Sequence, residues 1–223
     1  MRTYQTSAAI TRETRAACFF SLLIHKGERA CDTFDRIGRE EIKMDHVERI
    51  GRKLVFKGSV LDIYQDDIRT PNGKVVKWDF IGHIGAAAVV AVRDNGKLIM
   101  VKQYRNALDR MTIEIPAGKR DYEGEPTINC AIRELQEETG CTAEKMEYLM
   151  TLRTAIAYCD ELIDVYVATG LTQGEQHLDE DECVELLEFD VEELCRMIYA
   201  GELQDVKTIA AIMAYKNKYL IHD

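Results

Sequence analysis

The stretch from Gly118 to Cys141 reads GKRDYEGEPTINCAIRELQEETGC, and its second half has the pattern of an amphipathic helix. Pro126 suits the first turn of a helix, and Gly140 is typical of the residue that ends one. The apolar residues between them recur at helical spacing and form one stripe. They are Ile128, Ala131, Ile132 and Leu135. The pattern predicts a helix over residues 126–139.

Three glutamates share one face of this predicted helix. At about 100° per residue, Glu138 lies about 40° to one side of Glu134 and Glu137 about 60° to the other. Left unpaired, like charges four residues apart oppose a helix by roughly a few tenths of a kcal/mol. A hard divalent cation resolves this repulsion, because Mg²⁺ binds a few carboxylates together with water and phosphate oxygens. The alternative is an exposed acidic face, held by Arg133 four residues before Glu137.

The overall composition is that of a globular protein with a substantial core. The chain has 223 residues, 46% of them hydrophobic and 30% charged, and its net charge is −10. Residues 1–53 hold 11 Lys and Arg against 8 Asp and Glu, so residues 54–223 hold 18 against 31. An acidic surface repels a phosphate backbone, so no nucleic-acid partner is expected. A divalent cation would be needed between such a protein and an anionic substrate.

The cysteines and the N-terminal residues indicate a cytoplasmic protein. The seven cysteines form no C-x-x-C pair and no zinc-spaced cluster, which favours reduced thiols. The apolar run over residues 16–24 is too short to span a bilayer and lacks a clear cleavage site, so no membrane association is expected. Residues 1–43 lack a sustained period and are predicted to be an extension outside the core. Either translation starts at Met44, or the extension is a genuine helical or mobile segment.

Strand patterns precede and follow the predicted helix. A turn at Pro71-Asn72-Gly73 separates two expected antiparallel strands, and a second turn at Asp94-Asn95-Gly96 separates two more. A loop that contains glycine is expected between residue 115 and the helix. The expected strands cover residues 54–56, 60–64, 75–81, 86–92, 98–101, 113–115, 146–153, 162–168 and 184–189, and two further helices cover residues 191–199 and 206–219.

The opening stretch resembles the Nudix box, G-x5-E-x7-R-E-U-x-E-E-x-G-U, in which U is an apolar residue. Six residues rather than five separate Gly118 from Glu125, which predicts an insertion in the loop before the helix. The other positions remain in register. The matching residues are Gly118, Glu125, Arg133, Glu134, Leu135, Glu137, Glu138, Gly140 and Cys141.

Over about residues 50–220, the chain resembles the ADP-ribose pyrophosphatase branch of the Nudix hydrolases. The resemblance implies an α/β (α+β) Nudix fold, a mixed β-sheet sandwiched between helices. A small antiparallel β domain over residues 44–84 would precede a Nudix hydrolase domain over residues 85–223. It also implies a homodimer whose N-terminal strands help to form the partner's site.

The implied activity is the Mg²⁺-dependent hydrolysis of the pyrophosphate bond of nucleoside diphosphate sugars, with Mn²⁺ as an alternative metal. ADP-ribose would give AMP and ribose 5-phosphate. In that branch a Ser-Pro-Gly is typical after the box, whereas residues 154–161 read TAIAYCDE and lack the proline. UDP- and GDP-sugars are therefore alternative substrates. A sensor that binds ADP-ribose without turnover is another alternative, although the stretch after Phe189 is too short and too poor in Lys and Arg for a DNA-binding module.

The resemblance also implies roles for individual residues. Glu134, Glu137 and Glu138 match metal-binding positions, together with the backbone carbonyl of Ala117. Arg133 belongs with Glu137 to the catalytic set because it can hold that carboxylate in place. Glu182 matches a general base in the loop before residues 184–186. The alternative is a solvated acidic loop over residues 179–182 whose members are interchangeable, in which case Glu137 or a metal-bound hydroxide would act as the base.

Three more residues are implied to bind the substrate. Arg105 matches a phosphate-contacting arginine, for which a planar bidentate donor is suited. Glu114 matches a position that contacts the distal ribose, and Trp78 falls where some relatives stack the adenine. The alternatives are a surface ion pair for Arg105, a solvated acid at a strand end for Glu114, and core or dimer packing for Trp78.

Overall fold

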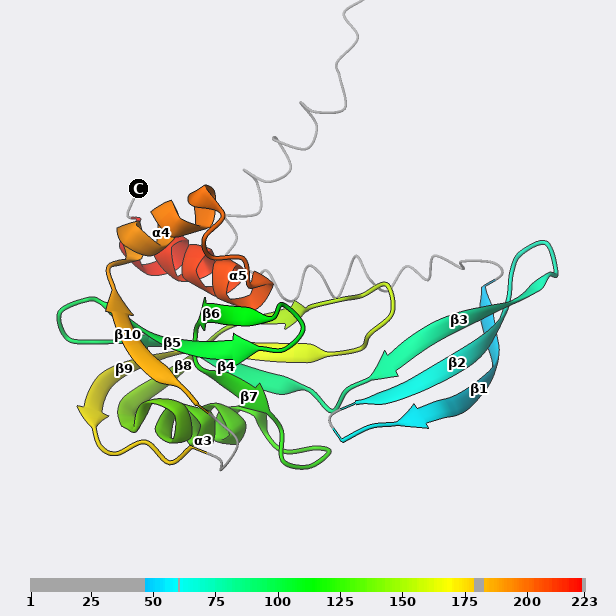
Figure 1. Cartoon of the computed structure of the whole chain (residues 1–223), viewed down its shortest axis with the longest axis horizontal. Helices are drawn as coiled ribbons and strands as arrows, with labels where there is room; N and C mark the ends of the chain where they lie inside the picture. The colour runs from blue at the N-terminus through cyan, green and yellow to red at the C-terminus, as the bar shows by residue number, and fades with distance from the viewer. Residues whose placement is uncertain (1–46, 60, 179–182, 222–223) are drawn as a thin grey trace, which may run out of the picture. The chain divides into compact units, whose positions relative to one another are not determined.

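The first three strands form a sheet of their own. The computed structural model describes residues 47–59, 61–178 and 183–221. Strands β1 (Glu48–Lys57), β2 (Asp62–Arg69) and β3 (Val75–Gly82) lie in the order β1-β2-β3 (Figure 1). Strands β2 and β3 are antiparallel, with Arg69 opposite Val75 on either side of the Pro71-Asn72-Gly73 turn. The predicted hairpin is therefore confirmed.

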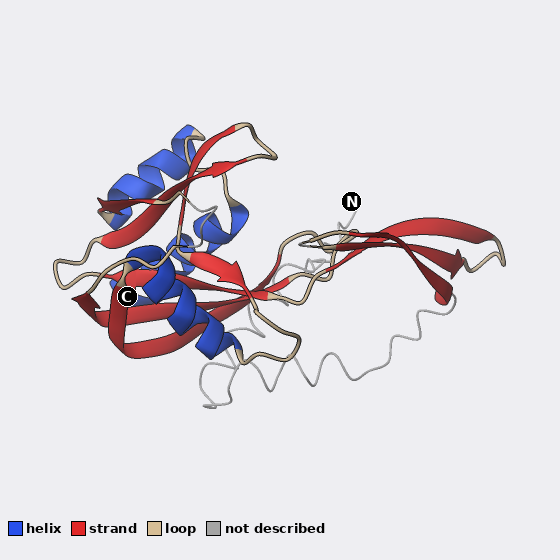
Figure 2. Ribbon diagram, turned by 60° about the horizontal axis from the view of Figure 1, so that its bottom comes forward, coloured by secondary structure: helices blue, strands red, loops and turns tan. Residues whose placement is uncertain are grey.

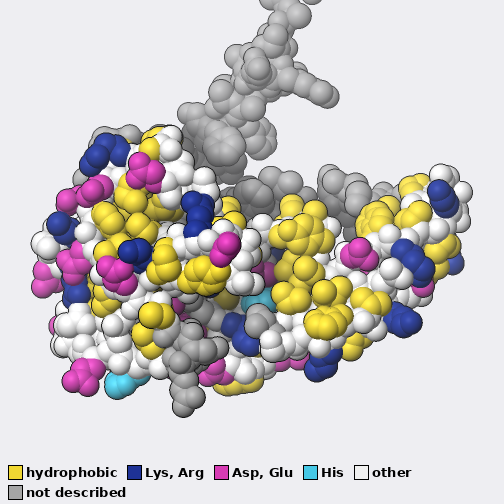
Figure 3. All heavy atoms as spheres, in the orientation of Figure 1, with side chains coloured by type: hydrophobic (Ala, Val, Ile, Leu, Met, Phe, Trp, Pro, Cys, Tyr) yellow, Lys and Arg dark blue, Asp and Glu magenta, His cyan; other side chains and the backbone are white. Residues whose placement is uncertain are grey.

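This three-stranded sheet exposes apolar side chains to solvent. Val55, Phe56 and Trp78 are each at least half exposed, and apolar side chains gather over these strands in Figure 3. Exposed apolar side chains that gather on one part of a surface are typical of interaction sites.

The remaining strands form a seven-stranded mixed sheet. Its main path runs β10-β5-β4-β9-β8, with β6 paired to β5 and β7 paired to β4. Strands β4 and β9 are parallel, whereas the other pairs are antiparallel. The strands are β4 (Ala86–Val92), β5 (Leu98–Arg105), β6 (Arg110–Glu114), β7 (Ala117–Lys119), β8 (Cys141–Arg153), β9 (Leu162–Gln173) and β10 (Glu185–Phe189).

Helices cover both faces of this sheet, because β4 is apolar on both sides. Ala87, Val89 and Ala91 pack into one buried cluster with Ala131 and Leu135 of α3 (Thr127–Thr139). The alternate residues of β4, Ala86, Ala88, Val90 and Val92, pack into the other cluster with α4 (Val191–Ala200) and α5 (Val206–Tyr215). Figures 1 and 2 show the resulting layers, with α3 on one side and α4 and α5 on the other. The predicted sandwich is confirmed.

Several boundaries differ from the prediction. Strand β7 falls where a loop is expected, since three residues that include a glycine carry no period-2 signal. Strand β8 begins at Cys141 rather than at residue 146, and the last α-helix ends at Tyr215, followed by a short π-helix over Lys216–Leu220. The predicted domain boundary at residues 84 and 85 stays a prediction, and residues 1–43 lie outside the described residues. Among the helices that the structure describes, none is long and apolar enough to cross a membrane.

Candidate active site

Helix α3 brings its glutamates to the sheet. The helix starts after Pro126 and ends at Gly140, whose φ of 71° suits a glycine at the C-cap. Glu134 and Glu138 are only 8% and 3% exposed, whereas the Glu137 side chain is more than a third exposed. Ionised carboxylates are costly to bury without partners. The burial of Glu134 and Glu138 therefore argues against a simple solvent-exposed acidic face.

The chain passes very close to this face at Ala117 and Gly118. The Ala117 N–H donates a hydrogen bond to Glu138 Oε2 at 2.9 Å. A Cβ at position 118 would lie 2.1 Å from the Glu134 carboxylate, so only glycine fits there without displacing that side chain. The glycine at the start of the quoted stretch thus permits a close approach of backbone to carboxylate.

Arg133 links the carboxylates to one another. Its Nη1 donates to Glu134 Oε1 at 2.7 Å and to Glu137 Oε2 at 2.9 Å, and its Nη2 donates to the carbonyl of Lys119 at 2.9 Å. Burial of Arg133 opposes its charge, but the charge of Glu134 and the hydrogen bond with Glu137 outweigh burial and raise the pKa of Arg133 further above its ordinary value. The predicted pairing of Arg133 with Glu137 is present.

The loop before α3 absorbs the extra residue. Glu125 is buried and accepts a hydrogen bond from the Asp121 N–H at 2.9 Å, so the loop closes on itself. Glu125 Oε2 also lies 3.7 Å from Arg133 Nη2. The spacing within α3 is therefore undisturbed by the insertion, and Glu125 still reaches Arg133.

The donor set on α3 suits a hard divalent cation. Carboxylate and carbonyl oxygens are the ligands that Mg²⁺ and Mn²⁺ prefer, and the Glu134 and Glu138 carboxylates adjoin the backbone at Ala117 and Gly118. Over the described ranges, no three His, Cys, Asp or Glu side chains converge closely enough to hold an ion. Glu134 and Glu137 instead share Arg133. These residues fit a divalent cation because they supply oxygen ligands and lie close to one another.

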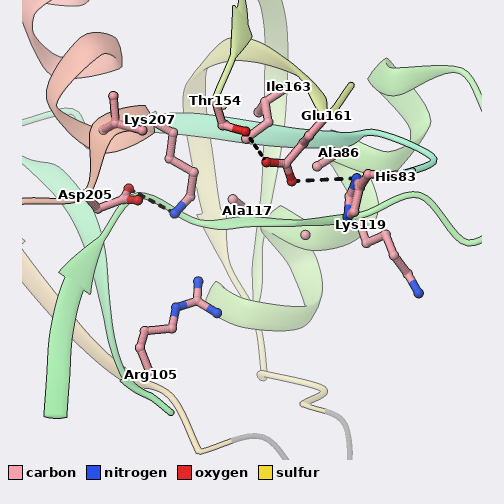
Figure 4. A pocket seen from close by; sticks show the side chains of 12 residues that line it. His83, Ala86, Arg105, Ala117, Lys119, Thr154, Glu161, Ile163, Asp205 and Lys207 are labelled. Atoms are coloured by element: carbon pink, nitrogen blue, oxygen red, sulfur yellow. Dashed lines mark hydrogen bonds and ion pairs between the residues drawn. The ribbon is translucent and has the colours of Figure 1, made fainter. Parts of the chain in front are cut away.

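A cavity of about 350 Å³ adjoins the same backbone segment. Ala117 and Gly118 form part of its wall, with Ala86 and Ile163 of the sheet. Charged and polar side chains occupy two sides, as Figure 4 shows. One group comprises Arg105, Asp205 and Lys207, and the other comprises His83, Thr154 and Glu161.

Behind the first group lies the buried carboxylate of Glu114. Arg105 binds it bidentately, from Nε at 2.7 Å and Nη2 at 2.6 Å, and the Lys207 ammonium contacts the same carboxylate. Burial alone would raise the pKa of Glu114, but the hydrogen bonds from Arg105 and the charge of Lys207 lower it to about 2. Asp205 completes the group, because its Oδ2 lies 2.9 Å from Lys207 Nζ.

The second group links the connection between β3 and β4, which holds His83, to the connection between β8 and β9, which holds Thr154 and Glu161. Thr154 Oγ1 donates to Glu161 Oε2 at 2.5 Å, and Glu161 Oε1 lies 3.6 Å from His83 Nδ1. The same His83 nitrogen accepts a hydrogen bond from the Gly85 N–H at 3.1 Å. A ring nitrogen that accepts is unprotonated, so a direct ion pair with Glu161 requires that hydrogen bond to be given up.

The protein-family model of the NUDIX domain matches residues 82–212 of this chain. The chain belongs to the Nudix family. An ADP-ribose pyrophosphatase of Bacillus subtilis (strain 168) is 42% identical over 165 residues, which are 73% of this chain and 89% of the relative. A methanol dehydrogenase activator of Bacillus methanolicus is 39% identical over 172 residues, 76% of this chain and 92% of the relative.

A solved structure of an ADP compounds hydrolase has the same fold. Its TM-score is 0.68 at 18% sequence identity, and the match covers 78% of this chain and 97% of that chain. At this identity the likeness shows the fold alone. Together with the mixed sheet and its helices on both faces, it confirms the Nudix fold predicted from the sequence.

The Nudix chain brings some of its predicted site residues together and leaves others apart. Arg133, Glu134, Glu137, Glu138 and Ala117 lie close together, and Arg105, which lines the cavity, forms an ion pair with the buried Glu114. Glu114 is 2% exposed, so its alternative as a solvated acid is wrong. The predicted base, Glu182, lies outside the described residues.

Trp78 lies on β3 of the three-stranded sheet and is not among the residues that line the cavity. It is 52% exposed, so the alternative of core packing is wrong for this chain. Stacking on a base and packing in a dimer both stay predictions for this side chain.

Sequence reasoning missed Asp205, Lys207 and His83. Asp205 had a readable signal, since an acid directly before a predicted helix is a typical N-cap, and it accepts from the Thr208 N–H at 3.0 Å. Lys207 and His83 carried no comparable signal, because a lone lysine near a helix start and a lone histidine between strands are common on any surface.

Proposed function

We propose that this chain hydrolyses the pyrophosphate bond of nucleoside diphosphate sugars, with ADP-ribose as the preferred substrate. The observation that carries the proposal is the buried carboxylate face of α3, packed against Ala117 and Gly118 at the wall of a polar cavity. ADP-ribose is favoured over UDP- and GDP-sugars because the Bacillus subtilis relative is an ADP-ribose pyrophosphatase.

Glu134, Glu137, Glu138 and the carbonyl of Ala117 would hold Mg²⁺, or Mn²⁺ in its place. When bound, the cation supplies the positive charge that an anionic pyrophosphate needs next to three carboxylates. Arg133 keeps Glu134 and Glu137 oriented through its hydrogen bonds to both. The carboxylate of Glu138 is held by the N–H of Ala117.

The chain's other residues would orient the substrate and move the proton. Arg105 uses Nε and Nη2 to hold Glu114, which leaves Nη1 for a phosphate oxygen. Water attacks one phosphorus, the P–O bond of the anhydride breaks, and AMP and ribose 5-phosphate leave. Glu182 takes the proton of the attacking water, as a carboxylate outside the metal set is suited to do.

A substrate panel tests this proposal. Phosphate release is followed through a coupled phosphatase for ADP-ribose, ADP-glucose, UDP-glucose and GDP-mannose, with Mg²⁺, with Mn²⁺ and with chelator. We expect ADP-ribose to be cleaved fastest and all release to stop with chelator. Tight calorimetric binding of ADP-ribose without release from any compound would contradict the proposal and favour a sensor. The Glu138→Gln variant serves as the inactive control.

We also propose that the chain forms a homodimer through its three-stranded sheet. Its exposed Val55, Phe56 and Trp78 support this, since such surface is stabilised when a partner covers it. Light scattering should give twice the chain mass for the native protein and a smaller mass for Phe56→Ser. If Trp78 stacks on adenine and does not pack against a partner, added AMP should quench its fluorescence.

The cytoplasm is the location that we propose for this enzyme. Cys130, Cys141 and Cys195 are buried free thiols, as expected in a reducing compartment.

A further inference from the structure

The carboxylate of Glu114 has no capacity left for a substrate. Its Oε1 accepts from Arg105 Nε and from Thr112 Oγ1, both at 2.7 Å. Its Oε2 accepts from Arg105 Nη2 at 2.6 Å and from Lys207 Nζ. A carboxylate has about four acceptor sites, so these four donors fill it. Its four filled acceptor sites therefore hold Arg105 and Lys207 in place.

Asp205 and Lys207, by contrast, line the cavity and keep hydrogen-bonding capacity. The three hydrogen bonds that Asp205 makes with described residues all go to Oδ2, from the Thr208 N–H, the Thr208 hydroxyl and Lys207 Nζ. Its Oδ1 is left to accept. The Lys207 ammonium has three protons and two carboxylate partners within the described residues, so one N–H is left to donate.

The pair is held rigidly with respect to the backbone beside α3. The Ile115 N–H donates to Thr208 Oγ1 at 3.0 Å, which ties the start of α5 to the segment that leads into Ala117. Lys207 is itself only 8% exposed and cannot move far without losing its contact with the buried Glu114 carboxylate. A donor and an acceptor are therefore presented at a fixed distance from Ala117 and Gly118.

The cavity beside Ala117 and Gly118 is large enough for part of the substrate. Small-molecule sites are typically about 300–1,000 Å³, and this cavity of about 350 Å³ lies at the lower end. It has room for the sugar phosphate half of a nucleoside diphosphate sugar, and a second cavity of about 660 Å³ is also lined by Arg105, Asp205 and Lys207. Because Ala117 and Gly118 lie against the α3 carboxylates, the phosphate belongs at that end. The sugar then extends toward the start of α5.

We propose that Asp205 and Lys207 recognise two neighbouring hydroxyls of the sugar, and this inference rests on the proposed function. Asp205 Oδ1 accepts a hydrogen bond from one hydroxyl, and Lys207 Nζ donates to the oxygen of the next. Figure 4 shows both side chains at the same end of the cavity as Arg105. The two residues determine specificity for a vicinal diol and do not touch the reacting phosphorus.

Product binding tests this assignment without turnover. Affinities of ribose 5-phosphate, 2-deoxyribose 5-phosphate and inorganic phosphate are measured by calorimetry with Mg²⁺ present. Both vicinal pairs of the furanose ring include the 2-hydroxyl, so its removal breaks either pair. Losing a hydrogen bond to a charged group corresponds to roughly a 10- to 100-fold weaker affinity. We expect the native protein to discriminate against the deoxy compound by that factor.

Two variants assign the discrimination to the pair. Asp205→Asn keeps an oxygen for Thr208 but turns the second acceptor into a donor, and Lys207→Met removes the ammonium at similar length. Each should reduce the discrimination to within about threefold while inorganic phosphate binds as before. Lys216→Met is the matched control, because Lys216 lies just after α5 and pairs with Glu192, away from the cavity lining. It should discriminate like the native protein.

Three results would overturn the proposal. They are native protein that binds both sugar phosphates equally, variants that retain the discrimination, and variants that weaken inorganic phosphate as much as ribose 5-phosphate. The first comparison needs no variant, so a variant that fails to fold leaves the test intact. If the protein discriminates against 2-deoxyribose 5-phosphate but releases no phosphate from any compound of the substrate panel, only the proposed hydrolysis is refuted. An active enzyme without discrimination would refute the Asp205–Lys207 assignment alone.

Discussion

Replacing Glu114 by glutamine removes one negative charge from between Arg105 and Lys207 and keeps the size of the side chain. The pKa of Glu114 falls from an ordinary 4.5 to about 2 in the folded chain, because the hydrogen bonds and charges of these two partners outweigh burial. A pKa that is lowered on folding stabilises the fold above the unfolded-state pKa, and this stabilisation is lost as pH falls through the folded-state pKa. The shift corresponds to about 3 kcal/mol at neutral pH.

The pH dependence of this effect is specific. Glutamine does not titrate, so the free energy of unfolding of Glu114→Gln should lie about 3 kcal/mol below that of the native protein at pH 7. The gap should shrink to about half at pH 3 and nearly close at pH 2, as the native carboxylate takes up its proton. Loss of one partner of a buried ion pair typically costs about 3–5 kcal/mol, which agrees in size.

Urea unfolding followed by far-UV circular dichroism at several pH values measures this gap. The matched control is Glu185→Gln, which removes an exposed carboxylate 2.9 Å from Lys102 Nζ. An exposed pair contributes about 0–1 kcal/mol, so this control should stay close to the native protein at every pH. The reasoning would be refuted if Glu114→Gln matched the native stability at pH 7. It would equally be refuted if the gap failed to narrow toward pH 3.

Three further predictions concern a metal-binding glutamate of α3, the glycine beside it and the proposed base. Glu138→Gln should abolish turnover with equal or slightly higher stability, because the amide keeps an oxygen for Ala117 and relieves repulsion; near-native kcat at saturating Mg²⁺ would contradict this. Gly118→Ala should lower kcat at least about tenfold, because the new Cβ would lie 2.1 Å from the Glu134 carboxylate; unchanged kinetics would show that this close approach is dispensable. Glu182→Gln should lower kcat by roughly 10² to 10⁴ with little change in KM, whereas Glu180→Gln should be nearly silent. Equal, small losses would move the role of base to Glu137.

The sequence predicted the elements whose local signals agree with their tertiary setting. The apolar run of β4 is buried on both faces, and the Pro-Asn-Gly and Asp-Asn-Gly turns each join two strands. Helix α3 has a proline before it and a glycine after it. Strand β7 escaped prediction because its pairing with β4 depends on a partner about thirty residues upstream and not on its own three residues.

The candidate site divides in the same way. The α3 carboxylates and Arg133 lie within one helix, so spacing alone placed them together. Glu114 and Lys207 are 93 residues apart, and their contact depends on where the start of α5 packs against the end of β6. Helical periodicity predicts which residues of α5 face the core, but it does not predict which strand end that helix will meet.

The charges at the two ends of the cavity explain why the site needs both a cation and a sugar-binding pair. Around Arg133, the three glutamates of α3 leave a surplus of negative charge that repels a pyrophosphate unless a metal ion comes with it. At the α5 end, the charges of Lys207 and Asp205 cancel, whereas Arg105 is held by Glu114 and keeps Nη1 for a phosphate oxygen. The neutral Asp205–Lys207 pair attracts no particular charge, but its fixed donor and acceptor distinguish hydroxyl patterns. Phosphate binding therefore belongs to the metal end and to Arg105, and the choice between sugars belongs to the α5 end.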